Sequence, residues 1–240
     1  MQFDLKGLDH DRLIALTRAP ALQSFLLAPD HPILLLNGSG SSLPQSEASF
    51  LSAKLVESIR STMVTNYKVL VLAFFCGQHR DKMDVYSNPS EMMMSLLLQM
   101  VEFCGALSAE DLLVCMSDLD PTDVNSICSA FENLVETLDE DFRVFIVLDG
   151  VQFFAEPASR GEKMREIVRG LLGICRKNHR AVLKILLASP TRSTFIEDLF
   201  DEVEVLTLPI HCRPAGVYGG TSLACLISMT EEGVEGNHST

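Results

Sequence analysis

Five short runs of β-branched residues and leucine, each nearly continuous in apolar side chains, constrain the fold of this chain most. They are Ile33–Leu36, Lys68–Phe75, Arg143–Leu148, Val182–Ala188 and Val203–Leu208. Runs without polar alternation are typical of strands that are buried on both faces of a sheet. Because segments with helical spacing separate the runs, the strands are expected to be parallel. The sequence therefore predicts an α/β fold, a three-layer sandwich with a mostly parallel five-stranded sheet.

Two of the helical segments begin with clear start signals. Asn88–Glu91 reads Asn-Pro-Ser-Glu, which combines a capping side chain, a proline at the first helical position and an early glutamate. Asp120–Asp123 repeats the signal as Asp-Pro-Thr-Asp. The predicted helices are Ala48–Ser61, Met92–Cys104, Val124–Leu138 and Glu162–Lys177, with one or two short helices over Asp9–Leu27.

Composition indicates a cytoplasmic protein without membrane contact. The chain has 240 residues, of which 47% are hydrophobic, but no apolar run approaches the roughly 20 residues of a membrane span. Residues 1–12 lack the apolar stretch of a signal peptide. The seven cysteines form no C-x-x-C pairs, and most of them (Cys76, Cys104, Cys128, Cys175) lie in apolar runs. They are expected to be reduced core thiols rather than zinc ligands or disulfide partners.

The net charge of −13 is unevenly distributed. Residues 81–160 hold 16 acidic and 3 basic side chains, whereas residues 161–185 hold 2 acidic and 7 basic ones. A chain this acidic is a poor candidate for binding nucleic acid. The basic residues of the second stretch are predicted to form a solvated outer helix face, with docking of a partner as the alternative.

The first apolar run leads into a loop rich in glycine and serine and then into a helical pattern. This order is that of a P-loop, whose backbone N–H groups hold nucleotide phosphates. With Gly38 as the first glycine of G-x-x-x-x-G-K-[ST], the last three positions are occupied by Leu43, Pro44 and Gln45. The loop thus lacks both the lysine that reaches the β- and γ-phosphates and the hydroxyl that holds Mg²⁺. Pro44 also removes one backbone N–H.

Three segments together resemble the NACHT-type branch of the signal-transduction (STAND) P-loop NTPases. They are Pro32–Gly38, Val144–Gln152 and Lys184–Arg192. The resemblance is strongest to degenerate fungal members, which are similar to the N-terminal domain of nephrocystin-3 and to AAA-type domains. It covers roughly residues 10–209.

The resemblance implies roles for residues at two strand ends. Asp149 stands where the family places the carboxylate that holds Mg²⁺ through water, but Gln152 and Phe153 replace the acids that follow it. Ser189 stands where a polar residue faces the γ-phosphate, and Arg192 where the family often has an arginine. A loop carboxylate at Asp149 and a plain turn after Ser189 are the structural alternatives.

The candidate nucleotide-binding residues are Asn37, Gly38, Ser39, Gly40, Ser41, Ser42 and Ser189, with Asp149 as the candidate metal ligand. The sequence offers no catalytic residue. A dinucleotide site is disfavoured because Leu43 replaces the third glycine of G-x-G-x-x-G. A Cys76–His79 pair has no defined geometry in the sequence.

These observations predict a helical lead-in (residues 1–27), a degenerate NTPase-like domain (28–209) and a C-terminal tail with at most one docked helix (210–240). We expect a catalytically inactive binding or scaffold module that acts through protein partners and needs no cofactor. This module is expected to be the truncated remnant of a larger signalling-type protein. The alternative is a nucleotide-binding switch, or a weak ATPase or GTPase, that uses ATP or GTP with Mg²⁺ through a non-standard loop.

Overall fold

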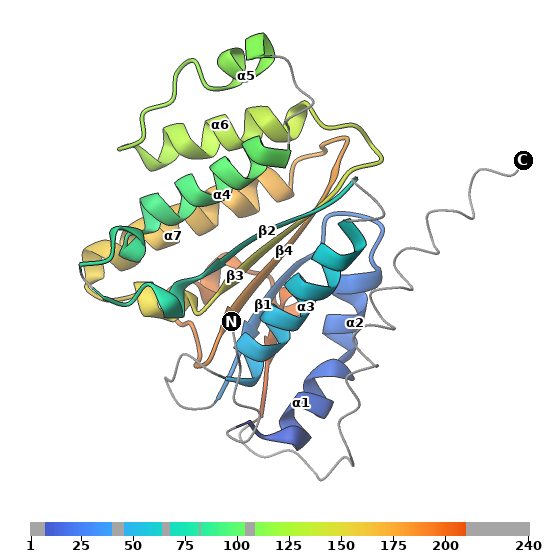
Figure 1. Ribbon diagram of the computed structural model, residues 1–240. Coiled ribbons are helices and arrows are strands. Elements are labelled where there is room, and N and C mark those ends of the chain that lie inside the picture. Colours follow the sequence, from blue (N-terminus) through green and yellow to red (C-terminus); the bar gives the residue numbers. More distant parts are fainter. Residues whose placement is uncertain (1–7, 40–45, 64–67, 82, 104–108, 210–240) are drawn as a thin grey trace, which may run out of the picture.

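The computed structural model describes residues 8–39, 46–63, 68–81, 83–103 and 109–209 (Figure 1). The helices are α1 (His10–Thr17), α2 (Pro20–Leu27), α3 (Glu47–Met63), α4 (Pro89–Phe103), α5 (Ala109–Cys115), α6 (Val124–Glu136) and α7 (Ala158–Cys175). The strands are β1 (Ile33–Asn37), β2 (Val69–Phe75), β3 (Arg143–Asp149), β4 (Val182–Ser189) and β5 (Val205–Thr207). The predicted tail, 210–240, lies outside the described residues, as do Gly40, Ser41, Ser42 and Cys104.

The five strands form one sheet in the order β2-β3-β4-β1-β5, and all neighbours are parallel. Each predicted run coincides with one strand to within two residues at either end, so the predicted α/β fold and its parallel sheet are confirmed. In this order β4 lies between β1 and β3.

Helices cover both faces of the sheet, as Figure 1 shows. Side chains of β3 alternate between two cores: Val144, Ile146 and Leu148 pack with α4, α6 and α7. Phe145 and Val147 pack with α2 and α3 on the opposite face. This two-sided burial is the reason that the strands are continuously apolar in sequence.

α6 begins at the predicted Val124 but has a different cap from the one its start signal predicts, α7 begins earlier than predicted, and α5 was not predicted. Asp123, rather than Asp120, caps α6 by accepting the N–H groups of Asn125 and Ser126, since Asp120 binds Thr122 within the preceding turn. α7 begins at Ala158, four residues before the predicted start. α5 is too short to give a clear periodic pattern.

The cysteines of the described segments are buried and form no disulfide bond with one another: Cys76, Cys115, Cys128 and Cys175. Burial raises the pKa of Cys128 and of Cys175 to about 12, so these thiols are unreactive at neutral pH. Among the described residues, no helix combines the length and apolar character that a membrane span requires.

The basic residues of α7 and the turn beyond it are not simply solvated, as the sequence had favoured. Arg165 pairs with Asp198, Arg176 with Glu204, Lys177 with Glu132, and Arg180 with Asp139. These carboxylates belong to the same chain, so much of the basic face is neutralised internally.

β2 is an edge strand, and a side chain of α4 occupies part of its open edge. The amide of Gln99 accepts the N–H of Ala73 at 3.0 Å and donates to the Ala73 carbonyl at 3.2 Å. Both backbone groups are thus satisfied without a neighbouring strand.

Lys184 is a charged residue on a central strand, yet it is buried. Its Nζ donates to the carbonyls of Leu26 at 2.6 Å and Phe25 at 3.4 Å, in the last turn of α2. These carbonyls lie where a helix has no internal partners. Lys184 therefore anchors the last turn of α2 to the sheet near the start of β1.

We expect Lys184→Ala to lower the free energy of unfolding by about 3 kcal/mol, because it leaves a cavity and two helix carbonyls without donors. Lys184→Met is the matched control, since it keeps the side-chain stem and removes only the ammonium. Denaturant unfolding should place the Met variant between wild type and Ala. A Met variant as unstable as Ala would contradict a contribution from the stem.

Candidate functional site

The carboxyl ends of β1, β3 and β4 meet at one edge of the sheet. Asn37 lies opposite Ser189 in the β1–β4 register, and Asp149 lies opposite Ala188 in the β3–β4 register. The side chains of Asn37, Asp149 and Ser189 are all buried. The three candidate residues thus lie at one edge of the sheet, and open α/β sheets bind ligands at this kind of edge.

Asn37 uses both ends of its amide within the chain. Its Oδ1 accepts the N–H of Ser193 at 3.0 Å, and its Nδ2 donates to Glu197 at 3.3 Å. Arg192 holds the same Glu197 carboxylate through its Nε at 2.8 Å and through Nη2. The hydrogen bond from Arg192 lowers the pKa of Glu197. Asn37 and Arg192 therefore fix the segment that follows β4.

The start of the glycine-rich loop packs tightly against that same segment. The Gly38 N–H donates to the Ser189 carbonyl at 2.7 Å. A Cβ at Gly38 would lie 2.4 Å from the Pro190 carbonyl oxygen, a distance that atoms do not tolerate. Glycine is required here by the approach of two backbones, independently of any phosphate.

Ser189 faces the turn that follows β3. Its hydroxyl donates to Oε1 of Gln152 at 2.8 Å, and Gln152 belongs to the short helix η4 (Val151–Phe154). The Gln152 Nε2 is buried without a hydrogen-bond partner among the described residues. Gln152 stands in the segment where the resembled family carries acids. The Ser189 hydroxyl therefore contacts a neutral amide instead of a carboxylate.

Asp149 lies against the start of α3. Burial raises its pKa to about 7, although hydrogen bonding to Ser49 and Ser52 of α3 lowers it in part. Its Oδ1 and the Ser52 hydroxyl have no partner at full hydrogen-bond geometry in the described part of the chain. The two serines were not predicted as site residues. Their spacing of three on the buried side of an amphipathic helix was the available signal.

Asp149 alone does not make a magnesium site. Mg²⁺ prefers octahedral coordination by ionised carboxylates and water molecules. The Asp149 carboxyl, in contrast, is buried, and its pKa of about 7 leaves it half-neutral near neutral pH. The described residues contain no cluster of three His, Cys, Asp or Glu side chains that could hold a metal. The metal role of Asp149 therefore stays a prediction, and we derive no step through Mg²⁺.

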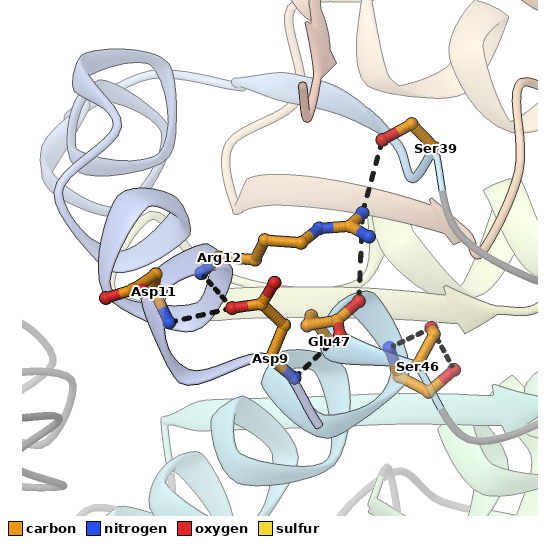
Figure 2. Close-up of polar contacts among 7 residues, drawn as sticks. Asp9, Asp11, Arg12, Ser39, Ser46 and Glu47 are labelled. Atoms are coloured by element: carbon orange, nitrogen blue, oxygen red, sulfur yellow. Dashed lines mark hydrogen bonds and ion pairs between the residues drawn. The ribbon is translucent and has the colours of Figure 1, made fainter. Parts of the chain in front are cut away.

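An arginine from the lead-in helix occupies the space between β1 and α3 (Figure 2). Arg12 Nη2 donates to the Ser39 hydroxyl at 3.3 Å and lies 3.7 Å from the Glu47 carboxylate. Glu47 is the first residue of α3, and its other oxygen accepts the Asp9 N–H at 3.1 Å. Only 9% of the Arg12 side chain and 11% of the Glu47 side chain are exposed.

This arrangement was not predicted, because no sequence pattern connects Arg12 with Glu47. A working P-loop has a lysine at the start of the helix that follows it. Here the first turn of α3 carries an acid, and the cation comes from α1. The Arg12 Nε remains buried and without a partner among the described residues.

The Cys76–His79 alternative does not form a reactive pair. The nearest sulfur contact of Cys76 is Met92, at 4.0 Å, and burial raises the pKa of the thiol. His79 stacks on Phe74 and shares a hydrogen bond with Asp84 at 2.8 Å. These contacts give both residues structural roles.

Residues 15–189 match the family described as Nephrocystin 3, N-terminal. The chain belongs to this family. The match runs from α1 to the last residue of β4 and supports the predicted resemblance to a divergent NTPase-like domain. Within the family match lie Glu47, Asp149 and Ser189, whereas Arg12 precedes it.

No curated protein matches the sequence. Among solved structures, the chain is similar to the Orc1 protein of Aeropyrum pernix in complex with DNA, with a TM-score of 0.46 and 15% identity. The similarity covers 92% of this chain and 48% of the Orc1 chain, so this family member spans about half of that protein.

The pKa of Asp149 leads to a pH-dependent prediction. It is about 7 in the folded protein and ~3.9 when unfolded. The folded chain therefore binds more protons between these values, and its stability falls as the pH rises from ~4 to 7. We expect Asp149→Asn to stabilise the fold most above pH 7, where it should raise the unfolding free energy by up to a few kcal/mol and with it the melting temperature. The gain should shrink progressively toward pH 4.

The exposed Asp118 provides the control, because Asp118→Asn changes the same charge without burial. Calorimetric melts at several pH values would show no change for this variant. A pH-independent difference between Asp149→Asn and wild type would contradict the raised pKa.

Arg12 and Glu47 should be coupled energetically. Either single variant, Arg12→Met or Glu47→Gln, leaves one largely buried charge without its partner, which is expected to cost about 3 kcal/mol. The double variant should cost clearly less than the sum of the two. Additive losses in denaturant unfolding would show that the two side chains do not interact.

Proposed function

We propose that this domain is a catalytically inactive, NTPase-like binding or scaffold module. The observation that carries the proposal is the position of Arg12, whose guanidinium lies between Ser39 and Glu47, where a P-loop would receive phosphate. A bound phosphate would have to displace Glu47 from Arg12 and would meet the Glu47 charge at the start of α3.

Three further features support the absence of hydrolysis. The glycine-rich loop lacks its lysine and hydroxyl, and Gln152 and Phe153 replace the acids that would polarise water. Loss of single groups of this kind typically lowers a rate by ~10²–10³. Ser189, Asn37 and Arg192 are engaged with other residues of the chain.

We further propose that the module acts through protein partners in the cytoplasm. Its charge of −13 opposes nucleic acid, while several large apolar side chains remain exposed: Met83, Val85, Leu113, Val114 and Val203. The buried thiols, which form no disulfide bond among the described residues, suit a reducing compartment.

A nucleotide-binding switch is the second candidate, and specific observations favour it. Arg12 Nε and Asp149 Oδ1 are buried polar atoms without partners among the described residues, and both adjoin the start of α3. Buried polar groups normally find partners, and a phosphate or its bound water would provide them. If the domain is such a switch, Arg12 leaves Glu47 and contacts the nucleotide.

Thermal melts with millimolar ATP or GTP and Mg²⁺ separate the two candidates. The inactive module is expected to show no rise in melting temperature. A ligand present at 100 times its Kd would instead stabilise the fold by ~2.7 kcal/mol, which is a shift of at least ~5 °C for a chain of this size. Such a shift, lost in Arg12→Met, would establish the switch.

Turnover supplies the second readout. We expect no Mg²⁺-dependent release of phosphate above background from the purified chain. Hydrolysis that Asp149→Ala abolishes would overturn the assignment as inactive.

A further inference from the structure

A hollow lies at the start of α4 and α7. These two helices pack side by side on the face of the sheet opposite α3 (Figure 1). Its volume is about 760 Å³, within the ~300–1,000 Å³ range of small-molecule pockets. The residues that matter for its chemistry are Arg80, Asn88, Glu156, Ser159, Arg160 and Lys163. None of the predicted site residues lines it.

The lining is cationic within an acidic chain. It contains Arg80, Arg160 and Lys163, with Glu156 as its one acid. None of these three cations forms an ion pair with a carboxylate in the described ranges, although Arg165 of the same helix is paired with Asp198. The hollow therefore carries a net positive charge, because Glu156 alone opposes three cations in its lining.

Aromatic rings and carbonyls hold the two guanidinium groups in place. Arg160 donates to the carbonyls of Phe153 at 2.8 Å and Ser87 at 3.3 Å, and it lies 5.4 Å from the centre of the Phe154 ring. Arg80 lies 4.7 Å from the centre of the Phe153 ring. Such cation–π contacts orient a guanidinium without neutralising its charge. The two arginine side chains therefore lose little conformational freedom when an anion binds.

Two helices add positive potential at the same place. Asn88 caps α4 by accepting the Ser90 N–H at 3.1 Å, and α7 begins at Ala158 without a side-chain cap. The N-terminal ends of both helices carry partial positive charge, which adds to that of the three cations lining the hollow.

We propose that this hollow binds a small molecule that carries two or more phosphate groups. Arginine forks and a lysine ammonium match phosphate oxygens in charge and geometry. The ligand must be compact, because residues 81–160 hold 16 acidic and 3 basic side chains and would repel an extended polyanion beyond the hollow.

Calorimetric titration of the full chain with inorganic pyrophosphate, at a fixed ionic strength of about 0.15 M, tests the proposal. The double variant Arg80→Gln/Lys163→Gln should weaken binding at least about tenfold, because it removes two charge-assisted contacts. Both side chains are exposed, so the fold should persist. The matched control is Arg60→Gln/Arg169→Gln, which removes two exposed charges elsewhere and should change the affinity less than about twofold.

Absence of pyrophosphate binding to wild type would overturn the proposal. Equal weakening in both double variants would also overturn it, since binding would then follow net charge alone. If Arg12→Met abolished binding, the phosphate would lie at the glycine-rich loop instead. Tighter binding of a phosphoserine peptide than of pyrophosphate would replace the small molecule with a phosphorylated protein.

Discussion

Burial of the sheet on both faces governs where polar chemistry is possible in this domain. The side chains of β3 enter two separate apolar cores, and β4 is buried along nearly its whole length. Polar side chains are therefore concentrated where strands end, and parallel strands place those ends together. Asn37, Asp149 and Ser189 lie together there for this reason, and the side chain of each is buried.

Withdrawal from water forces these groups to find partners inside the chain. Asn37 and Ser189 find them in the segment after β4 and in Gln152, and the Arg12 guanidinium is shared between Ser39 and Glu47. The hollow beside α4 and α7 differs in kind, because its three cations have no described counter-ion. The chain thus combines a sheet edge whose polar groups are only partly paired within the described residues with a surface hollow whose cations form no described ion pair.

The helices and strands that could be predicted from the sequence are those determined by residues close together in the chain. Doubly buried strands are continuous in apolar residues, and Asn88 caps α4 through its own side chain. The cap of α6 differs from the predicted one because the sequence offers two aspartates, and only Asp123 reaches the helix N–H groups. The Arg12–Glu47 pair and the serines around Asp149 depend on how distant segments pack. No local pattern in the sequence encodes such contacts. The role of Lys184 as the anchor of α2 could not be predicted for the same reason.

The contact between Gln99 and Ala73 affects how copies of this chain meet one another. A sheet edge normally exposes a row of free N–H and C=O groups, which is a template for adding a strand from another molecule. Near the middle of β2 that template is interrupted, because one side-chain amide mimics a neighbouring strand and occupies both groups of Ala73. At the opposite edge, β5 offers only three residues. The domain is therefore protected against growing into a continuous intermolecular sheet, even though its strands are among the most apolar segments of the chain.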